Sequence, residues 1–172
     1  MILIISTCKE KLSELEFVLP IQNIVGKSVV KSYEEITDKD ISAAKKIILT
    51  GTALKDFEYL KHDFSWLKKV KVPVLGICAG MQIIAKELGI KLVDKTNIGV
   101  KQVQVVQENK LASGTFNAYF LHTKTGTGNF KALAVSDGVP CMIKHPEKEI
   151  YGCIFHPEVI NEGIIRSFAL HS

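Results

Sequence analysis

Short apolar runs alternate with helical stretches through the first half of the chain. The runs lie at residues 1–6, 27–32, 46–50 and 72–77, and each predicts a strand. Strands that are almost continuously apolar, and that alternate with helices, are typical of a parallel sheet covered on both faces. The pattern therefore predicts an α/β fold with a parallel sheet at its centre.

The stretches between these runs predict helices. Residues 11–19 predict a helix that ends near Pro20. Apolar positions at helical spacing between residues 57 and 67 predict a second helix with one buried stripe. A third helix is predicted by the apolar stripe over residues 81–88, where Gly89 is a natural stop.

The second half of the chain has a different pattern. Residues 102–105 alternate polar and apolar side chains, and residues 119–122, 131–135, 142–144 and 150–155 predict further short strands. These strands either extend the central sheet or form an antiparallel side layer, and apolar residues at 164, 165 and 168 predict a closing helix. We expect three layers: a mostly parallel sheet, helices on both faces, and a few antiparallel strands.

Residues 1–172 show no repeat, linker or low-complexity block, so we expect a single domain. The chain is 47% hydrophobic and 23% charged, which excludes a disordered protein or a fibre. No apolar run approaches the ~18 residues of a membrane span. The start of the chain lacks a basic leader, so we interpret it as a strand and expect no membrane partner.

The charge and the cysteines narrow the candidate functions further. The net charge is only +4, and Arg166 is the only arginine among 22 basic residues. Because arginine dominates specific contacts with bases and phosphates, we do not expect a nucleic-acid partner. The four cysteines lack the spacing of a metal site, so we expect no metal, and reduced thiols in the cytoplasm.

One cysteine lies at the junction of a predicted strand and helix. Residues 74–82 read V-L-G-I-C-A-G-M-Q, with Cys78 between Gly76 and Gly80. This is the thiol counterpart of a nucleophile elbow, in which a sharp strand-to-helix turn exposes the reactive side chain. The positive end of the following helix favours the thiolate. The alternative is a buried structural cysteine at a tight turn.

A histidine and a glutamate follow a second apolar strand. Residues 151–158 read Y-G-C-I-F-H-P-E, and the side chains of His156 and Glu158 leave an extended backbone on the same side. A reactive thiol needs a base, and that base needs an acceptor to orient it. The same tripeptide at residues 145–147 is flanked by lysines, and we predict that it is a surface turn.

Together these motifs resemble the class I glutamine amidotransferases, whose glutaminase domain uses a Cys-His-Glu triad. The resemblance covers residues 47–168 in the family's order. Residues 76–82 resemble its G-x-C-x-G-x-Q motif, and residues 151–158 its Y-G-V-Q-F-H-P-E motif. Residues 98–99, 121–122 and 163–168 resemble its Ile-Gly segment, its histidine-bearing strand end and its closing helix.

The resemblance implies a role for each matching residue. Cys78 would be the nucleophile, His156 the general base and acid, and Glu158 the residue that orients His156. The backbone amide of Ala79 would stabilise the oxyanion, and Gln82 would help to hold the amino-acid end of the substrate. The implied reaction converts glutamine to glutamate and ammonia through a thioester, without a cofactor. Since ammonia must be delivered, the implied partner is an ammonia-accepting synthetase subunit.

The segment after the third strand departs from the family's L-S-G-G-P-G pattern. Residues 49–54 read L-T-G-T-A-L, so Gly51 matches, but Thr52 stands where the second glycine would supply an oxyanion donor. The amidotransferase subunit of imidazole glycerol phosphate synthase also lacks that glycine. By analogy, a partner or acceptor would have to turn the Thr52 peptide. Alternatively, Thr52 fits without strain, or Gly51 supplies the donor.

Other features leave the subfamily and the exact activity open. Residues 6–12 resemble neither the anthranilate-synthase-type nor the GMP-synthase-type members. The same triad serves γ-glutamyl peptide hydrolases, and a non-catalytic regulatory homologue is a third hypothesis. Cys8, after the first strand, either lines the pocket or is a packed thiol. His122 either faces the same rim or is a turn histidine without a catalytic part.

Overall fold

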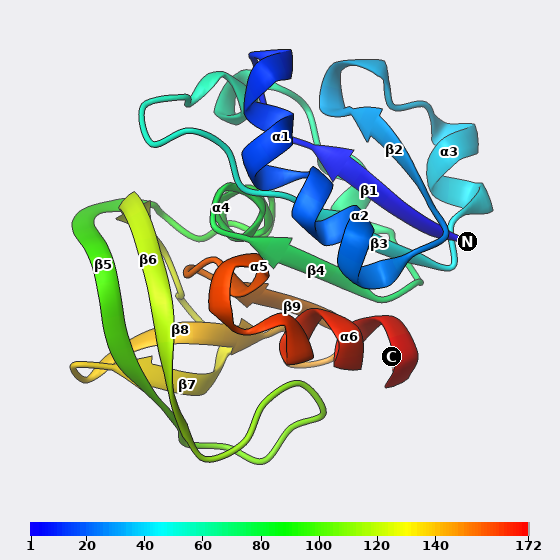
Figure 1. Ribbon diagram of the computed structural model, residues 1–172. Coiled ribbons are helices and arrows are strands. Elements are labelled where there is room, and N and C mark those ends of the chain that lie inside the picture. Colours follow the sequence, from blue (N-terminus) through cyan, green and yellow to red (C-terminus); the bar gives the residue numbers. More distant parts are fainter. Residues whose placement is uncertain (172) are drawn as a thin grey trace.

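The computed structural model describes residues 1–171, whose strands form one nine-stranded sheet in the order β2-β1-β3-β4-β9-β8-β7-β5-β6 (Figure 1). The strands are β1 (Ile2–Ser6), β2 (Ser28–Ser32), β3 (Lys46–Leu49), β4 (Val74–Ile77), β5 (Val93–Val105), β6 (Thr115–Thr125), β7 (Lys131–Ser136), β8 (Val139–Lys144) and β9 (Ile150–Cys153). The α-helices are α1 (Glu14–Phe17), α2 (Leu19–Val25), α3 (Asp38–Ala43), α4 (Ala79–Glu87), α5 (Pro157–Ile160) and α6 (Glu162–His171).

The sheet has a parallel part and an antiparallel part. Strands β2, β1, β3, β4 and β9 are parallel, and β8, β7, β5 and β6 extend the same sheet in antiparallel fashion. The α/β prediction is confirmed, and the antiparallel strands extend the central sheet. No helix within residues 1–171 combines the length and the apolar character that crossing a membrane requires.

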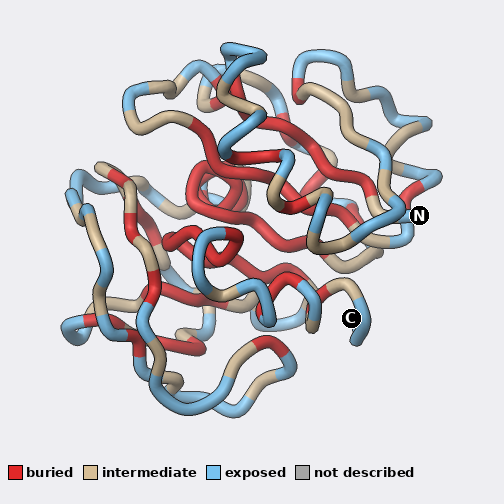
Figure 2. Tube along the Cα trace, viewed as in Figure 1, coloured by how far each residue is buried: buried red, intermediate tan, exposed pale blue. Residues whose placement is uncertain are grey.

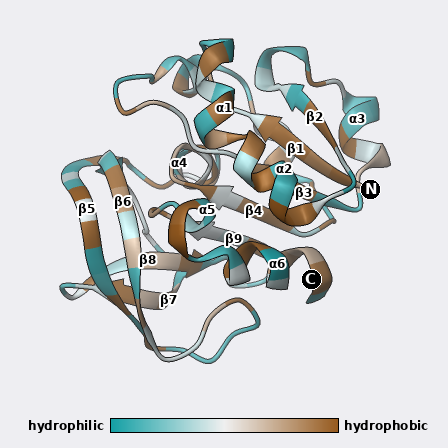
Figure 3. Ribbon diagram, in the orientation of Figure 1, coloured by the Kyte–Doolittle hydropathy of each residue, from teal (hydrophilic) through white to brown (hydrophobic). Residues whose placement is uncertain are grey.

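Alternating side chains of the parallel strands fill two cores, one on each face of the sheet. On β1, Ile4 belongs to one core while Leu3 and Ile5 belong to the other. Figure 1 shows α1, α2, α5 and α6 in front of the parallel strands, with α4 behind. Figure 2 shows that β1, β3, β4 and β9 are almost entirely buried, whereas the edge strand β2 is not, and Figure 3 shows the hydrophobic character of β1. This burial explains their continuous apolar runs.

The region predicted as one helix over residues 11–19 contains a break. The 3₁₀ turn η1 (Lys11–Ser13) leads into α1, and α2 then begins at Leu19. Pro20 lies in the first turn of α2, where a missing N–H costs no hydrogen bond. Proline therefore lies at the start of a second helix, which the pattern of apolar positions did not predict.

The single helix predicted over residues 57–67 is wrong. The structure has two 3₁₀ turns there, η3 (Glu58–Lys61) and η4 (Ser65–Lys68). Between them, the Asp63 side chain accepts the Ser65 N–H at 2.7 Å, and Glu87 accepts the Phe64 N–H at 3.1 Å. Because these side chains take the N–H groups that a helix would use, the helix is interrupted, although its apolar stripe is still largely buried.

Strands β5 and β6 form a long two-stranded ribbon at one end of the sheet (Figure 1). They pair from Val93 with Thr125 to Gln104 with Thr115, far beyond the predicted residues 102–105 and 119–122. Much of β5 is exposed and polar, so its outer part lacked an apolar signal. The ribbon matters because β6 passes beside the carboxyl ends of β4 and β9.

Candidate active site

The predicted site residues meet at the carboxyl edge of the parallel strands. Gly51 lies two residues after β3, Cys78 follows β4, and His156 lies three residues after β9, while Thr7, which was not predicted, follows β1. In open α/β sheets, ligands bind at this edge, near the point where the strand order reverses. Here the order reverses between β1 and β3, one strand away from Cys78.

Cys78 has the backbone conformation of a nucleophile elbow. Its φ is +50° and its ψ is −99°, and its N–H donates to the Cys153 carbonyl at 2.7 Å. A non-glycine residue at positive φ is uncommon and marks a constrained position. α4 begins at the next residue, Ala79, so the sulfur lies at the positive end of that helix.

The two glycines of the motif allow the elbow to pack closely. A Cβ on Gly76 would lie 2.6 Å from the carbonyl carbon of Gly80. A Cβ on Gly80 would overlap the carbonyl oxygen of Leu49 on β3. Any side chain at either position would force α4 away from the sheet and move Cys78.

His156 and Glu158 form a buried pair. Nδ1 of His156 lies 2.9 Å from Oε2 of Glu158, and both side chains are only 1% exposed. The backbone N–H of His156 donates to the Tyr119 carbonyl on β6 at 2.8 Å, which fixes the start of α5. Burial alone would lower the pKa of His156. The charges of Cys78 and Glu158 outweigh burial, so this pKa lies well above its ordinary value of 6.5.

The surroundings of Gly51 show that Cys78 and the imidazole of His156 lie close together. A Cβ built on Gly51 would lie 2.7 Å from Cε1 of His156 and 3.5 Å from Cβ of Cys78. Sγ of Cys78 donates to the Leu121 carbonyl at 3.5 Å. Nε2 of His156 is buried without a hydrogen-bond partner in the described chain. The raised pKa of the ring allows His156 to hold a proton that the Cys78 thiol gives up.

Gln82 is held from two sides. The Tyr59 hydroxyl donates to Oε1 of Gln82, and Nε2 of Gln82 donates to the Lys124 carbonyl at 2.9 Å. The side chain thus connects α4 to η3 and β6. Because Gln82 is only 2% exposed and both of its polar atoms are bonded, its contact with a substrate stays a prediction. Tyr59 was not among the predicted site residues.

Ala79 and Thr52 are the two residues expected to supply oxyanion donors, and each directly follows a residue of the site, Cys78 and Gly51. Ala79 is the first residue of α4, and the N–H groups of a helix's first turn have no partner within the helix. Thr52 is buried, and its hydroxyl donates to Oδ2 of Asp56 at 2.8 Å. Asp56 and Thr7 were not among the predicted site residues, although Thr7 and Thr50 each directly follow one of two neighbouring strands.

His122 is not the turn residue that one alternative predicted, whereas Cys8 is a buried thiol, as one of its alternatives predicted. His122 is buried within β6 and is not a turn residue; burial lowers its pKa to about 4. It lines a cavity of about 130 Å³ between the β5–β6 ribbon and β8. Cys8 is buried with Sγ 3.7 Å from the Gly51 carbonyl oxygen, and burial raises its pKa. Within residues 1–171, no three His, Cys, Asp or Glu side chains cluster as metal ligands.

The family model described as "Glutamine amidotransferase class-I" matches residues 22–164. The chain belongs to this family. The match includes both the elbow and the His-Pro-Glu segment, so the resemblance noted from the motifs is confirmed.

Individual relatives agree with this assignment. The A subunit of the glutamine-hydrolysing GMP synthase of Pyrococcus furiosus is 34% identical over 139 residues, which are 73% of this chain and 74% of that protein. Its counterpart in Pyrococcus abyssi is 36% identical over 111 residues, but the chain spans only 59% of that relative's length. The structure of a candidate GMP synthase A subunit from Thermoplasma acidophilum has a TM-score of 0.81 at 20% identity, covering 98% of this chain and 92% of that one, and so shares the fold.

Proposed function

We propose that this chain is a glutaminase subunit that hydrolyses glutamine to glutamate and ammonia, with Cys78, His156 and Glu158 as its catalytic residues. The observation that carries the proposal is the closeness of Cys78 and His156 around Gly51. A Cβ added to Gly51 would touch both the Cys78 Cβ and the His156 ring. The buried Glu158 carboxylate, 2.9 Å from the same ring, supplies the orienting acceptor.

In the first half of the reaction, the Cys78 sulfur attacks the side-chain amide carbon of glutamine. The thiol proton passes to Nε2 of His156, and a tetrahedral oxyanion forms. His156 then gives this proton to the amide nitrogen, the C–N bond breaks, and ammonia leaves. A γ-glutamyl thioester remains on Cys78.

In the second half, water attacks the thioester carbon while His156 accepts one of its protons. The C–S bond breaks, His156 returns the proton to sulfur, and glutamate leaves. Glu158 accepts a hydrogen bond from Nδ1 of His156 and holds this nitrogen in the donor state, so that Nε2 carries the moving proton. The backbone N–H groups of Ala79 and Thr52 are the proposed oxyanion donors, and Gln82 is proposed to contact the amino-acid end of glutamine.

The proposed partner is an ammonia-accepting synthetase subunit. Relatives named as the A subunit of glutamine-hydrolysing GMP synthase support this pairing, and we propose on that ground that the partner is the synthetase subunit of a GMP synthase. The sequence alone left the acceptor open, because residues 6–12 lack the GMP-synthase-type segment. We further propose that residues 1–172 form a single domain in the cytoplasm. Four free, buried cysteines support a reducing compartment.

The test is glutamate release from glutamine by the purified chain, alone and with extract of its native host. Cys78→Ala should abolish the activity, while Cys141→Ala, which removes a buried thiol of β8, should keep it. A preference for γ-glutamyl peptides would instead favour a peptide hydrolase. The absence of turnover, together with no selective labelling of Cys78 by a diazo-ketone analogue of glutamine, would support a non-catalytic homologue.

A further inference from the structure

The carbonyl oxygen of Gly51 is surrounded by side-chain donors. The Thr50 hydroxyl donates to it at 3.0 Å and in turn accepts the Thr7 N–H at 3.2 Å. The Thr7 hydroxyl donates to the Thr50 carbonyl at 2.8 Å and lies 3.2 Å from the Gly51 oxygen. Both threonine side chains are fully buried. The Gly51–Thr52 peptide therefore has a fixed carbonyl end.

The direction of that carbonyl determines where the Thr52 N–H points. Strand β3 has β1 on one side and β4 on the other, and Thr7 follows β1 while Cys78 follows β4. Since the peptide is trans, a carbonyl directed at Thr7 turns the N–H of Thr52 away from Thr7, to the side of β3 on which β4 lies. Within residues 1–171 this N–H donates to no backbone carbonyl.

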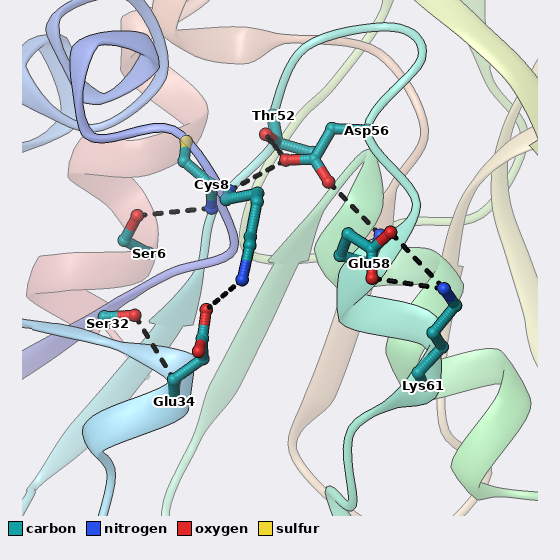
Figure 4. Close-up of polar contacts among 9 residues, drawn as sticks. Ser6, Cys8, Ser32, Glu34, Thr52, Asp56, Glu58 and Lys61 are labelled. Atoms are coloured by element: carbon teal, nitrogen blue, oxygen red, sulfur yellow. Dashed lines mark hydrogen bonds and ion pairs between the residues drawn. The ribbon is translucent and has the colours of Figure 1, made fainter.

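The Thr52 side chain is fixed independently. Its hydroxyl donates to Oδ2 of Asp56 at 2.8 Å (Figure 4). The same oxygen accepts the Lys9 N–H at 2.8 Å. Oδ1 of Asp56 accepts the Glu58 N–H at 3.2 Å. Asp56 thus joins the Thr52 loop to the segment after β1. The φ of Thr52 is not positive, so a β-branched residue causes no backbone strain here.

We propose that Thr7, Thr50 and Asp56 form a clamp that holds the Thr52 N–H as an oxyanion donor before glutamine or a partner binds. The three are positioning residues, because they act through the Thr52 peptide. Preorganised donors stabilise the oxyanion without rearrangement during the reaction. The clamp rests on the proposed glutaminase activity and removes the need for a partner to turn the peptide.

The test replaces the clamp hydroxyls with groups of the same shape. Thr50→Val and Thr7→Val should each lower the kcat of glutamine hydrolysis at least about 10-fold, within the ~10²–10³ expected for loss of a complete donor. KM should stay within about twofold, since the donor acts on the transition state. Thr50→Ser and Thr7→Ser, which keep the hydroxyl, should restore kcat.

Two further variants complete the experiment. Thr52→Val loses only the bond to Asp56 and should also lower kcat. This variant tests the clamp if a variant at Thr7 or Thr50 fails to fold. Glu34→Gln, which breaks the exposed pair with Lys9 at 3.4 Å, should leave kcat unchanged. Folding of each protein is checked by thermal unfolding.

The outcomes separate the clamp from the glutaminase proposal. If the valine variants keep the kcat of the unmodified protein, the clamp is wrong even though Cys78→Ala is inactive. The clamp is also wrong if the unmodified chain neither hydrolyses glutamine nor accumulates a thioester until a partner is added. If Cys78→Ala retains full activity, the glutaminase proposal itself fails.

Discussion

Replacing Gly51 with alanine places a methyl group where the His156 ring lies. The new carbon would be 2.7 Å from Cε1 and 3.2 Å from Nδ1 of His156, and 3.5 Å from Cβ of Cys78. The first distance is far inside van der Waals contact, so the ring must move. The Cys78 contact is ordinary, so the sulfur residue can stay. The variant therefore separates the imidazole from a thiol that keeps its position.

The size of the movement follows from these distances. Widening the Cε1 contact from 2.7 Å to 3.4 Å, where ordinary contact begins, moves the ring by about 0.7 Å. A misplacement near 1 Å in a catalytic group costs about 10²-fold in rate, so we expect kcat to fall by about that factor. Because Gly51 does not have a positive φ, alanine adds no backbone strain and the fold should persist.

The assay measures kcat and KM for glutamine, with thermal unfolding as the check on folding. Gly163→Ala is the matched control, since a methyl group there meets nothing within 4 Å. It should keep kcat, and alanine in helix α6 should raise stability by up to about 1 kcal/mol. A folded Gly51→Ala protein with an unchanged kcat would refute the shared placement of ring and sulfur.

Further predictions concern the base and the elbow. Glu158→Gln removes the anion that helps to raise the pKa of His156, so this pKa should fall, as followed by NMR titration of the ring. Protonated His156 stabilises the fold fully below its unfolded pKa, and this stabilisation is lost as the pH rises through its raised folded pKa. The Glu158→Gln variant should reduce this stabilisation, as measured by urea unfolding at several pH values. An unchanged dependence of stability on pH would contradict the prediction. Gly80→Ala, which presses on the Leu49 carbonyl, should lower the free energy of unfolding by about 1–3 kcal/mol, and an unchanged urea midpoint would count against the packing argument.

The catalytic candidates were predictable because each lies in a short local pattern. Cys78 stands between two glycines at a strand–helix junction, and His156 and Glu158 are two residues apart. Their meeting point follows from parallel strands, whose carboxyl ends share one edge. The Thr7–Thr50 contacts join residues 43 apart through backbone and hydroxyl groups, so no spacing in the sequence revealed them.

The spacing of apolar residues gave a wrong prediction where side chains compete with the backbone for hydrogen bonds. Residues 57–67 have helical spacing of apolar positions, but Asp63 and Glu87 take up N–H groups that the helix needed. The outer part of the β5–β6 ribbon was not predicted for the opposite reason: its exposed strands need no apolar residues, so the sequence carried no apolar pattern there. Burial on both faces was predicted correctly for β1, β3, β4 and β9, but not for the edge strand β2.

The threonine at position 52 illustrates how one departure from a family pattern has two opposite meanings. Glycine at this position would be free to rotate, and its amide would have to be ordered before it could stabilise an oxyanion. Thr52 has less freedom in the unfolded chain, and its hydroxyl bond to Asp56 fixes the loop further. If the clamp proposal is right, threonine in place of glycine at position 52 replaces a freely rotating backbone amide with a fixed one. A missing glycine then indicates rigidity in the active-site loop and gives no reason to expect lost catalysis.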